Sequence, residues 1–290
     1  MRAYRNQDGK KKKQKALPMM VLRKMLDLQS TNWQSAVAWL LIGAIFFAMR
    51  SCEYLDTKSP EADRRTRILR LQNIIFKKDG RTLKHDNDKL EDSDIVMIIF
   101  EFQMNDKRDI QVHMFRTSDK SLNPVIAWAR TIKRVWSYPG TTEDSTVCTF
   151  LDSKGKLVQI QASQVRDWLK ATVELIGADT LGFTPEDVGL HSIRSGGAMA
   201  MFLSKTSTII MMRVGRWSSD AFLEYIREQI ENFTVDVSEN MIKFETFFNM
   251  SNEQSSESRS SYDKENGPDR VPFGVNYSQL SLRGGNRMTR

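Results

Sequence analysis

Apolar residues recur at regular spacing from residue 18 onward, and the spacing changes from helical to strand-like and back. After Pro18, apolar side chains three and four residues apart predict an amphipathic helix. The nearly unbroken apolar run from residue 33 to residue 49 predicts a helix that is buried on all sides. Segments 68–76, 95–102 and 110–114 then have the β-branched or alternating pattern of strands. The chain therefore begins with helices and continues into a small sheet.

Helical spacing returns after residue 122. Asn123 predicts the start of a helix that reaches Trp136, and Gly177 predicts the end of one that begins at Gln161. The turn-forming pair Asn105-Asp106 predicts a hairpin between the last two strands. Four more helices are predicted at 191–204, 207–214, 218–230 and 235–249. This order predicts an α+β fold that is mostly helical, with a small antiparallel three-stranded sheet.

Composition narrows the class of protein. The chain has 43 Lys and Arg against 36 Asp and Glu, a net charge of +7, which suits a polyanionic partner. Two cysteines without a CxxC pair and three scattered histidines argue against a zinc cluster or a disulfide framework, and favour a reducing compartment. The apolar run 36–49 is too short to cross a bilayer easily, and no signal peptide is visible.

The two ends of the chain differ from its middle. Residues 1–17 are predicted to be a basic disordered arm with a lysine run, Lys10 to Lys13, followed by Lys15. The run is open to three readings: a solvated tail, a phosphate contact or a nuclear-import signal. Residues 251–290 lack apolar periodicity and are predicted to be a disordered tail. One domain is therefore expected at 18–250.

Several residues have chemistry suited to phosphate. Arg50 is the first charge after the long apolar run, and Glu53 is placed to orient its guanidinium. His191 and Arg194, spaced i, i+3, share one face of a predicted helix and can reach one phosphate. Tyr225 carries a hydroxyl that can attack phosphorus. Taken singly, each has an ordinary structural reading, such as a helix-terminal arginine or a core tyrosine.

Four segments in this order resemble the catalytic domain of the tyrosine recombinases, the phage-integrase family. They are AMRSCEYL, a β-hairpin with a turn lysine, HSIRSGG and GRWSSDAFLEYIR. The resemblance covers residues 18–250, and it is close to the eukaryotic, transposon-borne branch such as Crypton-type elements.

The resemblance implies a role for each matching residue. Arg50 and Arg194 would hold the non-bridging oxygens of the scissile phosphate, with Glu53 beside the first arginine and His191 in the His-x-x-Arg pair. Tyr225 would attack, giving a 3′-phosphotyrosine and a free 5′-hydroxyl. No metal, cofactor or small-molecule substrate is implied. The implied partners are double-stranded DNA and further copies of this chain, as a tetramer on DNA and away from any membrane. The implied location is the nucleus if the host is eukaryotic, and otherwise the cytoplasm.

The chain departs from the family pattern at three places. The position of the catalytic lysine, just before the hairpin turn, matches Met104, and Lys107 in the turn is the candidate substitute. The family's His/Trp position falls on Arg216 by direct counting from Tyr225, with Trp217 adjacent and favoured here as the phosphate donor. Family members usually carry a helical DNA-clamping domain before the catalytic one, whereas about 17 residues precede the first predicted helix here, so either the sequence is a fragment or the basic arm is a reduced substitute. The leading reading is an active strand-transferring enzyme, and the second is a DNA-binding derivative that has lost cleavage. A third reading is an unrelated helical adaptor whose motifs match by chance.

Overall fold

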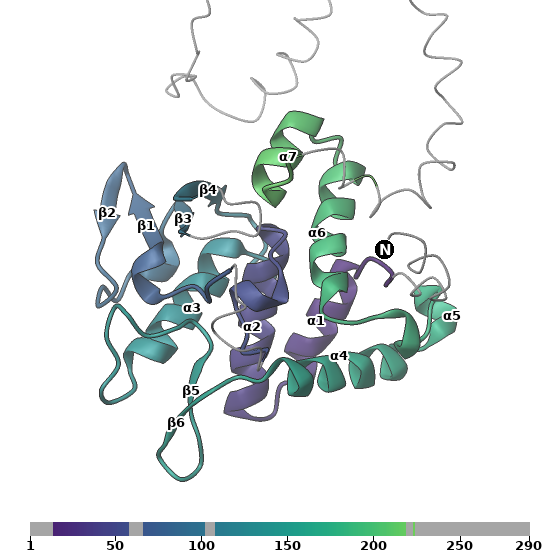
Figure 1. The fold of residues 1–290 in the computed structure, drawn as a ribbon, viewed down its shortest axis with the longest axis horizontal. Coiled ribbons are helices and arrows are strands. Elements are labelled where there is room, and N and C mark those ends of the chain that lie inside the picture. Colours follow the sequence, from purple (N-terminus) through teal and green to yellow (C-terminus); the bar gives the residue numbers. More distant parts are fainter. Residues whose placement is uncertain (1–13, 58–65, 102–107, 219–222, 224–290) are drawn as a thin grey trace, which may run out of the picture. The chain divides into compact units, whose positions relative to one another are not determined.

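The computed structural model describes residues 14–57, 66–101, 108–218 and 223, all within the compact unit Met1–Glu231. Helix α2 (Asn32–Phe46) lies at its centre and packs against α1 (Met19–Leu28), α3 (Pro124–Trp136) and α6 (His191–Leu203) (Figure 1). Every residue of α2 from 36 to 45 is buried, because apolar residues cover all sides of this helix. The Thr31 side-chain oxygen accepts the backbone N–H of Gln34, and Gln34 Oε1 accepts the backbone N–H of Thr31. These two hydrogen bonds form a capping box at the N-terminus of α2.

The sheet lies beside α3. It has the order β2–β1–β3–β4 and is antiparallel throughout. Its strands are β1 (Ile74–Lys78), β2 (Arg81–Leu83), β3 (Ile95–Phe100) and β4 (Ile110–Phe115). Alternate residues of β3 are buried, and they face α3. The pairing of β3 with β4 confirms the predicted hairpin, whereas Asn105 and Asp106 lie outside the described residues.

The prediction of a three-stranded sheet is wrong, because this sheet has four strands in the described residues. The fourth strand, β2, is three residues long and largely exposed, so it has no apolar alternation to reveal it. Its signal is the pair Asp79-Gly80, which joins β1 to β2 with positive φ at both residues (49° and 73°). A two-residue turn of this kind is typical of tight hairpins.

The remaining described elements follow α3 in the chain. Strands β5 (Thr149–Leu151) and β6 (Leu157–Gln159) form a separate hairpin, followed by α4 (Ala162–Ile176), the short α5 (Ala178–Leu181), α6 and α7 (Thr208–Gly215). The predicted boundaries at Asn123 and Gly177 are confirmed. No helix among these residues has the length and apolar character needed to cross a membrane.

Two glycines set how closely α6 approaches its neighbours. A Cβ at Gly196 would overlap the carbonyl oxygen of Leu17, and one at Gly197 would overlap that of Ile45 near the end of α2. The absence of side chains lets α6 lie directly against these backbones. Arg194 is thereby brought to the C-terminal end of α2.

Residues 14–17 do not fit the prediction of a disordered arm. They run along the start of α6, where Leu17 N–H bonds to Ser192 O at 3.0 Å and the Leu17 side chain is buried in the main core. Leu17 follows a polar and basic stretch of the chain, and burying its side chain stabilises the docked conformation.

Candidate functional site

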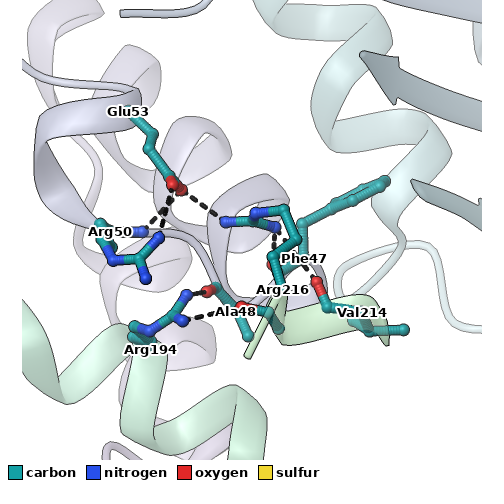
Figure 2. Close-up of polar contacts among 8 residues, drawn as sticks. Phe47, Ala48, Arg50, Glu53, Arg194, Val214 and Arg216 are labelled. Atoms are coloured by element: carbon teal, nitrogen blue, oxygen red, sulfur yellow. Dashed lines mark hydrogen bonds and ion pairs between the residues drawn. The ribbon is translucent and has the colours of Figure 1, made fainter. Parts of the chain in front are cut away.

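Three segments that are distant in sequence meet at the C-terminal end of α2. They are the turn after α2 with the short 3₁₀-helix Ser51–Glu53, the first turns of α6, and the end of α7 (Figure 2). Helix α2 ends at Phe46 rather than at residue 49, because Ala48 adopts a left-handed conformation with φ of 43°. Arg50 therefore lies beyond the helix, at the start of the 3₁₀-turn.

The Glu53 carboxylate lies at the centre of this junction and is 1% exposed. Its Oε2 accepts the backbone N–H of Arg50 at 2.8 Å, and its Oε1 accepts Nη1 of Arg50 at 3.2 Å. Its Oε2 also accepts Nη2 of Arg216 at 2.6 Å. The prediction that Glu53 orients Arg50 is thus matched by a contact with one guanidinium nitrogen, Nη1.

Arg216 is directed into the protein interior. Its Nη1 donates to the carbonyls of Phe47, at 3.0 Å, and Val214, at 3.1 Å, and its guanidinium lies 3.6 Å from the ring centroid of Phe100. The residue has left-handed backbone angles, φ 56° and ψ 39°, which turn the chain at the end of α7. The interior contacts of Arg216 make it a structural partner of Glu53, a role that sequence reasoning missed.

Arg194 ties α6 to both other segments. Its Nη1 donates to the carbonyl of Ala48, and its Nη2 donates to that of Gly215 at 2.7 Å, as Figure 2 shows for Ala48. The guanidinium lies 4.7 Å from the ring centroid of Trp217, a buried side chain. These contacts hold a guanidinium that is 1% exposed.

His191 is the first residue of α6, the helix that also carries Arg194. The charges of Arg194 and Arg50 both affect the pKa of its imidazole. Partial burial lowers the pKa of His191, and the positive charges of Arg194 and Arg50 lower it further. The imidazole is therefore neutral at pH 7 and able to accept a proton. Its backbone N–H donates to Oε1 of Gln14 at 3.2 Å.

The charge on Glu53 depends on its neighbours. Burial alone would raise the pKa of this carboxyl, but Arg216, Arg194 and Arg50, with the Arg50 backbone N–H, bring the pKa below its ordinary value. Glu53 is therefore ionised, and three positive charges surround one negative charge. This arrangement favours the approach of an anion.

The structure brings together six of the residues that the sequence singled out: Arg50, Glu53, His191, Arg194, Arg216 and Trp217. Met104, Lys107 and Tyr225 lie outside the described residues. Across 14–57, 66–101 and 108–218, no three His, Cys, Asp or Glu side chains gather as they would around a metal ion.

Comparisons with known proteins gave matches only among solved structures. No family model matches the chain, and neither does any curated protein. The XerH site-specific recombinase bound to its difH substrate matches with a TM-score of 0.43 and 16% identity, over 89% of this chain and 57% of that chain. The Tn1549 transposon integrase in complex with circular intermediate DNA matches with a TM-score of 0.42 and 12% identity, over 76% of this chain and 62% of that one. This chain thus spans about three-fifths of the length of either structure.

Replacing Glu53 by Gln is expected to destabilise the fold by roughly 3–5 kcal/mol, because it leaves the buried Arg216 guanidinium without its counter-charge. Urea unfolding measures this change. The double variant Glu53→Gln/Arg216→Met should recover part of the loss, since an apolar side chain needs no counter-ion. Glu91→Gln breaks the exposed pair with Arg130 and should cost only about 0–1 kcal/mol. Equal losses for Glu53→Gln and Glu91→Gln would contradict the central role of Glu53.

The lowered pKa of His191 predicts a loss of stability on mild acidification. The unfolded chain binds the proton near its ordinary pKa of 6.5, whereas the folded chain binds it only at lower pH, so stability falls as the pH decreases through 6.5 towards the folded value. The Glu53 contribution, present above the unfolded value of 4.5, disappears only at lower pH.

His191→Gln should flatten this part of the profile, measured as the urea midpoint at each pH. Subtracting the variant's profile from that of the wild type removes the contributions of the other histidines. A wild-type midpoint that rises relative to the variant on acidification would show that the sign is wrong.

Proposed function

We propose that this protein cleaves and rejoins DNA strands through a 3′-phosphotyrosine intermediate, as tyrosine recombinases do. One observation carries the proposal. Arg50 and Arg194, more than a hundred residues apart in sequence, lie at one junction around Glu53 with His191 beside them. A structural salt bridge alone would not explain why two further arginines and a neutral histidine join a Glu53–Arg216 pair.

In the proposed reaction, Arg50 and Arg194 neutralise the non-bridging oxygens of the scissile phosphate as negative charge develops on them. The Tyr225 hydroxyl attacks phosphorus, and neutral His191 accepts its proton. The bond to the 5′-oxygen breaks, and this oxygen leaves as a hydroxyl after receiving a proton from a general acid. The phosphotyrosine conserves the energy of the phosphodiester bond, so the reverse attack by a 5′-hydroxyl rejoins the strand.

The proposed catalytic domain comprises residues 18–250 and acts on double-stranded DNA as a tetramer. We place the protein in the eukaryotic, Crypton-like branch of the family, and its proposed location is the nucleus. The Trp217 ring packs against the guanidinium of Arg194 and holds it in place. The second candidate function is DNA binding without cleavage. The observation that favours it is Met104 at the position of the family's lysine, since a thioether cannot donate a proton.

Tyr225→Phe is expected to abolish covalent capture of DNA while leaving DNA affinity nearly unchanged. Only the hydroxyl is removed, and phosphate contacts supply most of the affinity. A nicked suicide substrate traps the covalent complex, which is then resolved by denaturing electrophoresis. Tyr54→Phe is the matched control, because Tyr54 is fully buried and its burial raises the pKa of the phenol. Capture that survives in Tyr225→Phe would assign the nucleophile elsewhere, and a salt-sensitive gel shift with no capture by the wild type would favour the binding protein.

Met104→Lys is expected to speed cleavage of an ordinary duplex, by up to roughly 10²–10⁴-fold, because it restores a general acid for the leaving 5′-oxygen. The gain should largely disappear on a substrate whose leaving oxygen is replaced by sulfur, since a thiolate leaves without a proton. Single-turnover rates on the two substrates measure the difference. If Met104→Lys has no effect while Lys107→Ala abolishes cleavage of the ordinary duplex, Lys107 is the general acid.

A further inference from the structure

The first turn of α6 takes a hydrogen-bond acceptor from a distant part of the chain. The N-cap residue Leu190 forms no side-chain cap. Instead, the backbone N–H of His191 donates to Oε1 of Gln14, 177 residues away in sequence, at 3.2 Å. The first N–H groups of a helix have no partner within it, so Gln14 satisfies a group that α6 itself leaves open.

Segment 14–17 brings Gln14 to this position through its backbone. Lys15 N–H donates to the carbonyl of Asp187 at 2.8 Å, and Leu17 N–H donates to that of Ser192 at 3.0 Å. The Leu17 side chain is 2% exposed and belongs to the main core. These contacts lie on either side of His191 in the sequence, so the segment holds the Gln14 amide against the start of α6.

The acceptor that meets His191 is uncharged, although charged residues are common in the segments that meet at this end of α6. The cations in these segments are Lys15, Arg50, Arg166 and Arg194. The carboxylates are those of Glu53, Asp56, Glu186 and Asp187. The two charges that act on the His191 imidazole, those of Arg194 and Arg50, are both positive.

Three of these carboxylates are bound to other partners. Glu53 accepts Arg50 and Arg216, and Asp56 accepts the side-chain amide of Gln161. Asp187 accepts the N–H and the hydroxyl of Thr184, while Arg166 and Glu186 are exposed. A carboxylate in place of the Gln14 amide would therefore introduce a negative charge one side-chain length from the imidazole.

An uncharged acceptor suits the role that the proposed reaction gives to His191. Helix N-termini are often capped by carboxylates as well as by uncharged oxygens, and a carboxylate beside a histidine favours the imidazolium. An imidazolium cannot accept the proton of the attacking hydroxyl. The Gln14 amide accepts the backbone N–H without stabilising the protonated ring.

We propose that Gln14 is a positioning residue for His191: its amide holds the first peptide of α6 and leaves the imidazole without a neighbouring negative charge. The proposal rests on the proposed function, which makes His191 the proton acceptor. It gives segment 14–17 a part in the site, although this segment contributes no group to the phosphate.

Two substitutions separate the hydrogen bond from the charge. Gln14→Ala removes the acceptor, whereas Gln14→Glu keeps an acceptor of nearly the same shape and adds a negative charge. The matched control is Gln29→Glu, which makes the same change at an exposed residue. Gln29 follows the far end of α1, so the added charge lies a helix length away from segment 14–17.

Nuclear magnetic resonance measures both effects in the intact chain, without any need for cleavage. The chain has three histidines, so His191→Gln identifies the His191 signals, and His85 and His113 are internal references. Gln14→Ala should speed hydrogen exchange of the His191 amide by roughly 2- to 10-fold, as expected for the loss of one hydrogen bond, and Gln14→Glu should not. Gln14→Glu alone should move the titration of the His191 imidazole to higher pH.

Single-turnover capture on the suicide substrate connects this contact to the reaction. If His191 accepts the proton of Tyr225, Gln14→Glu should shift the acid limb of the pH–rate profile to higher pH, in the same direction as the titration. Gln29→Glu should leave the acid limb unchanged.

The outcomes distinguish this proposal from the proposed function. Unchanged amide exchange in Gln14→Ala overturns the positioning role, and so does a His191 titration that responds equally to Gln14→Glu and Gln29→Glu. A shifted titration with an unchanged pH dependence of capture also overturns it, because His191 is then not the proton acceptor. The expected resonance changes without capture by the wild type support the hold of Gln14 on His191 and remove the strand-cleaving function.

Discussion

The Glu53 carboxylate is the group on which the arrangement of this site depends. It accepts hydrogen bonds from Arg50 and Arg216, which come from segments far apart in the chain, and its charge is stabilised further by Arg194. Burying one carboxylate is costly unless it is paired and hydrogen-bonded. Here the cost is offset by arginines whose positions the carboxylate in turn determines.

The arginines differ in how they serve this junction. Arg216 is wholly internal, held by the carbonyls of Phe47 and Val214, and it fixes the far side of Glu53. Arg50 retains part of its surface, and Arg194 reaches from α6 to carbonyls on both neighbouring segments. The junction therefore combines one arginine that supports the carboxylate with two that lie towards His191. Arg194 is 1% exposed, so Arg50 keeps more of its surface than either of the other two arginines.

The backbone geometry supports the same division. Ala48 and Arg216 both adopt left-handed conformations, and they end α2 and α7 where these helices approach each other. The helix ends leave carbonyls that accept hydrogen bonds from arginine side chains. Gly196 and Gly197 allow α6 close enough for Arg194 to reach those carbonyls. The helix ends, the close packing of α6 and the arginine charges therefore act together to position the guanidinium groups around Glu53.

The sequence by itself determined the elements whose signals are local. Asn123 and Gly177 marked helix boundaries correctly, alternation revealed β3 and β4, and the motifs singled out Arg50, Glu53, His191 and Arg194. Local signals failed where stability comes from distant contacts. β2 is too short and exposed to show alternation, and segment 14–17 looked disordered because its partners are residues 187–192.

Only the tertiary structure decided the direction of Arg216, which the sequence offered as a candidate for the phosphate. A left-handed turn points its guanidinium towards Glu53, 163 residues away in sequence. A buried arginine finds its counter-ion through the packing of whole helices, and no pattern of neighbouring residues encodes that choice.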